Sequence, residues 1–107
     1  MGLEEHQAWL VSFYKKRDWY KFSPEIRMNF LTEEVGELAR AIRTFEIGRD
    51  HPGEKKKDKA ERFDNLKEEL ADVVDQVLIL CRKYEIEPQE ILHYSENKLT
   101  ERFKDQQ

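Results

Sequence analysis

The sequence predicts an all-α protein built from four helices. Glycine and proline are scarce, with four glycines and three prolines among the 107 residues. The long segments between them are rich in Glu, Lys, Leu, Ala and Arg, which have high helix propensities. None of these segments shows the alternation of apolar and polar residues that is typical of a strand.

The first two helices are expected over residues 3–17 and from Ser23 to about Ile47. The first carries large apolar side chains on one side. Serine is a favourable N-cap and Pro24 suits the first helical position, so this pair marks the start of the second helix. Gly48 is well placed to end that helix, because glycine readily adopts the conformation that terminates many helices.

A polar, lysine-rich loop is expected over residues 48–59. Asp58 and Glu61 have the spacing of an N-cap and its capping-box partner, which predicts a third helix reaching about Tyr84. A proline in the first turn then opens a fourth helix over residues 88–104.

The second and third helices are unusually long for a chain of this size. Each is about 24–27 residues long, against a usual length of ~12. A single chain of four helices has few places to bury two such apolar faces. We therefore expect a bundle core shared between the chains of a homodimer or homotetramer.

Composition restricts the class of protein. One domain spanning residues 1–107 is expected, since most domains have ~100–150 residues. No segment reaches the ~20 apolar residues of a membrane helix, and the N-terminus carries acids where a signal peptide carries bases. The single cysteine, Cys81, excludes a disulfide within the chain and a cysteine-based zinc site. A single cysteine fits the reducing cytosol, so we expect a cytoplasmic protein. The net charge of −4 argues against a duplex-DNA binder, and we expect neither a nucleic acid polymer nor a membrane as a partner.

Two segments of the chain repeat one pattern. Residues 31–38 match residues 66–73 position by position, 35 residues apart. Both have the order apolar, polar, Glu, Glu, apolar, small, acidic, apolar. Gly36 and its counterpart Ala71 are the small residues, which leave room for a neighbouring helix or a bulky ligand. Because glycine inside a helix costs ~1 kcal/mol relative to alanine, we expect a close approach at Gly36.

A helical wheel shows where the acids of this repeat point. At ~100° per residue, Glu34 and Glu69 fall inside the apolar stripes of their helices, ~40° from the centre. Glu37 and Asp72 fall at the edge of the same stripes, on the same side. Each helix therefore directs one carboxylate towards the core and another onto the rim.

Four carboxylates in a partly buried cleft need a cation. At ~4 Å and an effective dielectric of ~20, each like-charged pair costs on the order of 4 kcal/mol. The motifs offer oxygen ligands without sulfur or imidazole, so the expected ion is Mg²⁺, with Mn²⁺ as a substitute. The alternative is a solvated helix face, which we expect for Glu33 and Glu68. The occurrence of one pattern twice in equal phase favours the metal site.

This double motif resembles the MazG-like all-α nucleoside triphosphate pyrophosphohydrolases. The E-x-x-E pair is Glu34 and Glu37, and the E-x-x-D pair is Glu69 and Asp72. Arg-Asp-Trp at residues 17–19 looks especially like the small dCTP-pyrophosphatase branch, and the resemblance covers roughly residues 6–103. It implies a four-helix MazG-like fold and Mg²⁺-dependent cleavage between the α- and β-phosphates of (d)NTPs, giving monophosphate and pyrophosphate. Family members remove noncanonical or surplus nucleotides.

The resemblance also implies residue roles. The four acids of the double motif would bind the metal and take part in catalysis, with Glu37, Glu34 or Glu69 as general base. Lys98 would offset charge on the pyrophosphate leaving group. Lys98 and Arg102 match basic residues of the family in type, but the family's asparagine is not at its usual place.

Several other side chains have two interpretations each. Trp19 can stack on a nucleobase or pack in the core. Asp75 can add a metal ligand or form a salt bridge. His6 is expected to pack, and the loop lysines can steer an anionic substrate or lie in a plain loop. The further candidates are Trp9, Tyr20 and Phe22 for stacking, Lys55, Lys56 and Lys57 for steering, and His51 and His93 as exposed histidines.

Other functions compete with this one. The phosphoribosyl-ATP pyrophosphohydrolase of histidine synthesis and a dimeric dUTPase belong to the same superfamily. A non-catalytic helical dimerisation or regulatory module is the alternative from a different class. A di-iron carboxylate bundle is discounted, because it needs a Glu-x-x-His pair, which neither motif contains.

Overall fold

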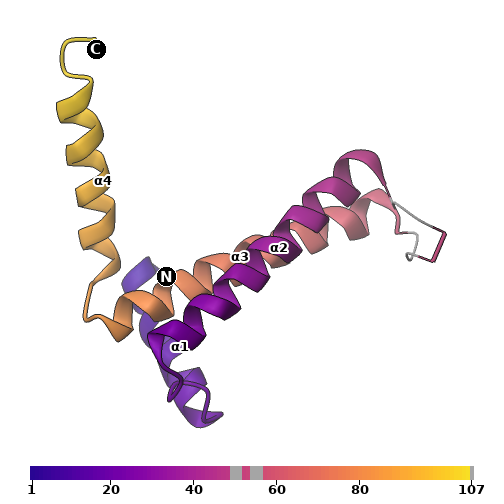
Figure 1. Ribbon diagram of the computed structural model, residues 1–107, viewed down its shortest axis with the longest axis horizontal. Helices are drawn as coiled ribbons and strands as arrows, with labels where there is room; N and C mark the ends of the chain where they lie inside the picture. Colours follow the sequence, from indigo (N-terminus) through magenta and orange to yellow (C-terminus); the bar gives the residue numbers. More distant parts are fainter. Residues whose placement is uncertain (49–51, 54–56, 107) are drawn as a thin grey trace. The chain divides into compact units, whose positions relative to one another are not determined.

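The computed structural model describes residues 1–48, 52–53 and 57–106. In this part of the chain there are four helices and no strand (Figure 1), so the predicted all-α class is confirmed. The helices are α1 (Leu3–Lys16), α2 (Pro24–Ile47), α3 (Lys59–Lys83) and α4 (Pro88–Arg102).

The start and end of α2 follow local backbone chemistry, as predicted. The Ser23 hydroxyl accepts a hydrogen bond from the Ile26 amide at 3.3 Å, and Pro24 occupies the first turn. Gly48 has a φ of 83° and donates its amide to the Thr44 carbonyl at 2.9 Å. A side chain would strain this left-handed conformation, so glycine suits the position.

Helices α1 and α3 are each followed by a residue with a positive φ angle. After α1, Asp18 has a φ of 61° and the Trp19 amide donates to the Tyr14 carbonyl at 2.9 Å. After α3, Glu85 has a φ of 58° and the next amide reaches back to the Cys81 carbonyl at 2.8 Å. A left-handed residue cannot continue a helix. The turn at Asp18 therefore ends α1 at Lys16, one residue earlier than predicted.

The chain forms two compact units, and each is described by itself. One comprises Met1–Phe22 with Leu78–Gln107, and the other comprises Ser23–Val77. The division falls within α3, which contributes to both. The expectation of one domain over residues 1–107 stays a prediction.

The unit formed by the two ends of the chain has an apolar core where α1 meets the end of α3. Its buried residues are Leu10, Val11, Tyr14, Leu78 and Ile79. Cys81 is also buried, and burial followed by the nearby charge of Glu90 raises the pKa of its thiol. The Glu4 carboxylate accepts a hydrogen bond from the Gln89 amide at 3.1 Å, which joins α1 to the first turn of α4.

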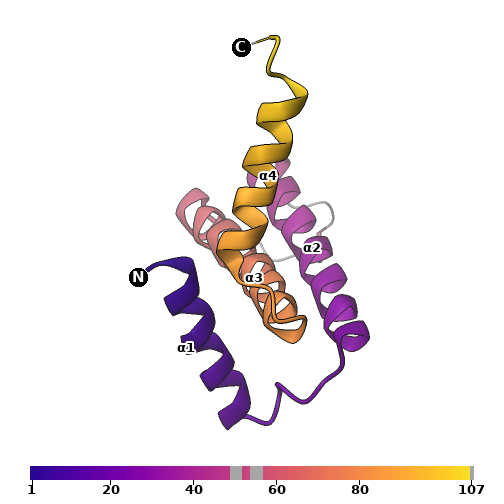
Figure 2. The same ribbon diagram turned by 90° about the vertical axis from the view of Figure 1, so that its left-hand side faces the viewer.

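The other unit is a hairpin of α2 and the first part of α3, which lie side by side (Figures 1 and 2). Phe45 and Phe63 meet near the loop with ring centroids 5.8 Å apart, while Arg27 contacts Gln76 near the opposite end. The two helices are therefore antiparallel. Within the described residues, no helix is long and apolar enough to cross a membrane.

Candidate metal centre

The structure brings the acids of the two repeated segments together. Carboxylate oxygens of Glu34, Glu37 and Glu69 all lie within 4.8 Å of one another. Oxygens of Glu68, Glu69 and Asp72 form a second group within the same distance. All of these residues belong to the hairpin of α2 and α3. We call the five of them the acidic cluster.

Burial in the acidic cluster matches the helical wheel, except that Asp72, which was expected at the rim, is not exposed. Glu34 and Glu69 are half-buried, whereas Glu37 is exposed at the rim. Asp72 is also half-buried. Glu68 was expected to be a solvated acid, and it is exposed, but its carboxylate lies close enough to share a cation with Glu69 and Asp72. The sequence contained a signal for this proximity, because Glu68 lies four residues before Asp72 on the same helix.

Two oxygen atoms of the acidic cluster lack hydrogen-bond partners. Oε2 of Glu34 and Oε2 of Glu69 are buried and have no partner among the described residues. A buried unsatisfied acceptor costs ~1–3 kcal/mol, and more when it is charged. A cation bound between the two carboxylates would remove this cost. The donor set, which contains only carboxylate oxygens, fits a hard divalent ion.

The electrostatics of the cluster raise the pKa of three of its acids. Burial, followed by the charges of Glu37, Asp72 and Glu69, raises the pKa of Glu34 to about 7. The pKa of Glu69 is raised by burial first and then by Glu37 and Asp72. Burial and the charge of Glu68 raise the pKa of Asp72, while a hydrogen bond with Glu34 opposes this rise. Without a cation, Glu34 is therefore partly protonated near neutral pH.

The face of α2 at Gly36 is open. A Cβ atom built on Gly36 would meet nothing within 4 Å in the described part of the chain. Among the described residues the expected close approach to Gly36 is therefore not found.

The remaining predicted site residues lie in the other compact unit. Trp19 is 44% exposed, and its ring meets those of Phe13 and Tyr14 edge-on, with centroids 6.2 and 5.5 Å apart. Lys98 and Arg102 are exposed on α4. Their roles in binding base and phosphates, like the ligand roles of the acids, stay predictions.

The histidines and loop lysines have mixed outcomes. His6 packs against Trp9 with a centroid distance of 5.9 Å and an interplanar angle of 17°, in line with the packing role expected for it. His93 is exposed, as expected. Asp75 is half-buried and contributes to the raised pKa of Asp72. Three of the predicted residues, His51, Lys55 and Lys56, lie outside the described residues.

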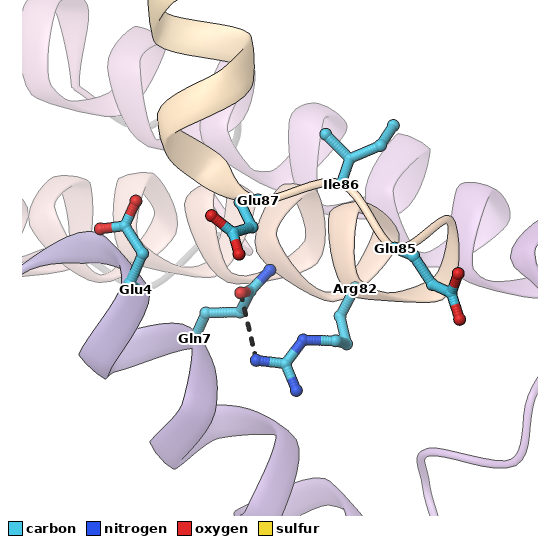
Figure 3. A pocket seen from close by; sticks show the side chains of 6 residues that line it. All are labelled: Glu4, Gln7, Arg82, Glu85, Ile86 and Glu87. Atoms are coloured by element: carbon cyan, nitrogen blue, oxygen red, sulfur yellow. Dashed lines mark hydrogen bonds between the residues drawn. The ribbon is translucent and has the colours of Figure 1, made fainter.

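A pocket in the first unit is separate from the acids of the repeated motifs. It has a volume of about 310 Å³, and Figure 3 shows the side chains that line it, which are Glu4, Gln7, Arg82, Glu85, Ile86 and Glu87. Gln7 donates to the Leu78 carbonyl at 2.9 Å and accepts from Arg82 at 3.3 Å. These polar groups join α1 to the end of α3.

Comparison with known proteins identifies the family. The family model described as "MazG nucleotide pyrophosphohydrolase domain" matches residues 22–106, which include the whole acidic cluster. The chain is 44% identical over 103 residues to "Uncharacterized protein YvdC" of Bacillus subtilis (strain 168), with 96% of this chain and 97% of the relative covered. No solved structure matches the chain. On the extent of these two matches, the chain belongs to the MazG nucleotide pyrophosphohydrolase family.

Proposed function

We propose that this protein is a Mg²⁺-dependent pyrophosphohydrolase of nucleoside triphosphates. It cleaves (d)NTPs between the α- and β-phosphates and releases a nucleoside monophosphate and pyrophosphate. The observation that carries the proposal is the pair of buried, unpartnered carboxylate oxygens, on Glu34 and Glu69, within an acidic cluster of two antiparallel helices. Membership of the MazG family supports the reaction type.

Glu34, Glu37, Glu69 and Asp72 would hold the metal. When bound, Mg²⁺, or Mn²⁺ in its place, would neutralise phosphate charge and lower the pKa of a bound water. Glu37 is our candidate for the general base, because it is the exposed acid of its group and its carboxylate has access to solvent water. In the reaction, water attacks the α-phosphorus, its proton passes to the carboxylate, and the bond to the β-phosphate oxygen breaks.

The resemblance to the family supplies the candidates for binding the rest of the substrate. Lys98 and Arg102 carry the positive charge that the polyphosphate needs, and Lys98 stabilises the pyrophosphate as it leaves. Trp19 is 44% exposed and is the candidate for stacking on a nucleobase. In this proposal the enzyme acts in the cytoplasm, in nucleotide metabolism, on noncanonical or surplus nucleotides.

The exposed apolar residues of the hairpin support a homo-oligomer. Large apolar side chains stay exposed along both helices, for example Val35 at 49%, Ile42 at 46% and Leu70 at 47%. Exposed apolar surface of this extent marks interaction sites in soluble proteins. We propose that a homodimer or homotetramer buries it, as the length of α2 and α3 predicts.

Product analysis tests the function. The protein is incubated with Mg²⁺ and a panel containing dCTP, dUTP, other (d)NTPs and phosphoribosyl-ATP, and the products are separated by ion-exchange chromatography. We expect monophosphate and pyrophosphate in equal amounts, and no reaction in EDTA. The substrate preference separates a general house-cleaning enzyme from a dUTPase or a phosphoribosyl-ATP pyrophosphohydrolase.

The matched controls are Glu37→Gln and Glu33→Gln. Both replace an acid of α2 by its amide, but Glu33 lies outside the acidic cluster. E37Q should lose turnover, whereas E33Q should keep it. Diphosphate and orthophosphate as products, or no turnover on any substrate, would contradict the proposal, and the second result would favour a helical dimerisation module.

A further inference from the structure

Two arginines connect α2 to α3, one on each side of the acidic cluster. Nη1 of Arg27 on α2 donates to Oε1 of Gln76 on α3 at 3.3 Å. Nη1 of Arg62 on α3 donates to the carbonyl of Thr44 on α2 at 3.1 Å. Both cross-links lie within the hairpin unit. Arg27 and Gln76 are buried, with 4% and 8% of their surfaces exposed.

The spacing of the cross-links follows the internal repeat. Arg27 stands seven residues before Glu34, and Arg62 stands seven residues before Glu69. The two arginines are thus 35 residues apart, the same distance that separates the two acidic segments. Each helix of the hairpin therefore carries an arginine in the same position relative to its first cluster acid.

The partners of the arginines also lie seven residues from an acid of the cluster, but not at matching positions of the repeat, since Thr44 and Gln76 are 32 residues apart. Thr44 lies seven residues after Glu37, and Gln76 lies seven residues after Glu69. Seven residues are nearly two helical turns, so a side chain seven positions away lies on the same side of the helix to within ~20° and ~10 Å along its axis. The cross-links thus lie on the helix faces that carry the cluster, on either side of it.

Each guanidinium is anchored on its own helix as well. Arg27 lies over the ring of Phe30, with its central carbon 4.6 Å from the centroid. Arg62 donates from Nε to the carbonyl of Asp58, the residue directly before α3, at 3.4 Å. A guanidinium fixed in this way loses little further freedom when it bonds to the facing helix.

We propose that Arg27 and Arg62 are positioning residues that hold α2 against α3, so that the acidic cluster is assembled before a cation arrives. Like charges in the cluster push the two helices apart. The cross-links oppose this separation at both ends of the cluster. The inference rests on the metal site of the proposed function, and it assigns the residues that keep that site in shape.

The test measures Mn²⁺ affinity by isothermal titration calorimetry, without nucleotide, on the full chain. The variants are Arg27→Met on α2 and Arg62→Met on α3. The control is Arg40→Met, which removes an exposed arginine from α2, three residues after Glu37. Removing a positive charge near a cation site strengthens cation binding by electrostatics alone. Losing a positioning contact weakens it, so the two explanations predict opposite signs.

We expect the Kd for Mn²⁺ to rise about tenfold or more in R27M and R62M, the loss typical of removing a group that orients metal ligands. R40M should bind Mn²⁺ as tightly as the wild type or more tightly. Gln76→Leu removes the acceptor of the Arg27 Nη1 hydrogen bond without changing charge and should weaken binding in the same way. In the double variant R27M/Q76L the loss of Mn²⁺ affinity should be no greater than in R27M alone, because both substitutions remove the same hydrogen bond.

Unchanged or tighter binding in R27M, R62M and Q76L would overturn the inference and leave the proposed function standing. Weakened binding in these variants, with a wild type that hydrolyses no nucleotide, would support the inference and refute the proposed function. A wild type that binds no Mn²⁺ would overturn both. Circular dichroism at the titration temperature identifies any variant that does not fold, and Arg62→Lys then replaces R62M, since it keeps the charge but lacks the guanidinium.

Discussion

Ionisation of Glu34 has a predictable effect on stability. In the folded protein its pKa rises from 4.5 to about 7, so the folded chain keeps a proton there at pH values where the unfolded chain has lost it. The free energy of unfolding therefore falls as the pH rises through this window. A pKa difference of this size corresponds to about 3 kcal/mol. Since the side chain is only half-buried, solvent screening reduces this to about 2 kcal/mol.

The substitution Glu34→Gln removes this ionisation. The amide is neutral at every pH and resembles the protonated carboxyl. We therefore expect metal-free E34Q to be about 2 kcal/mol more stable than the wild type at pH 8, with the difference shrinking towards pH 5. With Mg²⁺ the order should reverse, because the wild type gains stability by binding the ion through Glu34 and the variant loses this ligand.

The assay is urea unfolding in EDTA at several values between pH 5 and pH 8, followed by circular dichroism. Glu33→Gln serves as the control, because it removes the same charge one residue earlier on α2 from an exposed side chain outside the cluster. Its stability should run parallel to that of the wild type. Parallel pH profiles for E34Q and the wild type, or an E34Q that is less stable in EDTA at pH 8, would refute the reasoning.

Three further predictions concern the acidic cluster, the exposed apolar faces of α2 and α3, and Gly36. Millimolar Mg²⁺ should raise the Tm of the wild type, and neither Glu37→Gln nor Asp72→Asn should respond; an undiminished response in the variants, measured by scanning calorimetry, would count against the site. Light scattering should find a dimer or tetramer, and a monodisperse species of 13.0 kDa would contradict the shared core. Gly36→Ala should raise the free energy of unfolding by about 1 kcal/mol, because its Cβ meets nothing within 4 Å; a loss of stability in urea titrations would show that a second chain uses this face.

The helices were predictable because their ends depend on local chemistry. Ser23 and Gly48 act on backbone groups within four residues of themselves, so the sequence alone contains what sets the bounds of α2. The end of α4 was predicted two residues too late, at residue 104 instead of Arg102. No glycine or proline marks that end, and a fraying last turn of polar residues gives little signal.

The acidic cluster was partly predictable for a different reason. The phase of Glu34 and Glu69 on their helices follows from periodicity, which the sequence contains. That Glu68 approaches Asp72 follows from their spacing of four residues on α3, and it was missed because Glu68 was assigned to the solvated face. The partner of Arg27 depends on how α2 is aligned along α3, so it was missed, although the 35-residue spacing from Arg62 was visible in the sequence.

The buried position of Cys81 has a practical consequence. A thiol reacts with alkylating and oxidising reagents as its thiolate, and burial with a raised pKa keeps Cys81 protonated and shielded. Since the chain contains no other cysteine, a cysteine introduced at an exposed position of α4 should take up a maleimide fluorophore or a nitroxide selectively. The natural chain is thus a ready background for a spectroscopic test of the proposed nucleotide binding, without first removing its own sulfhydryl.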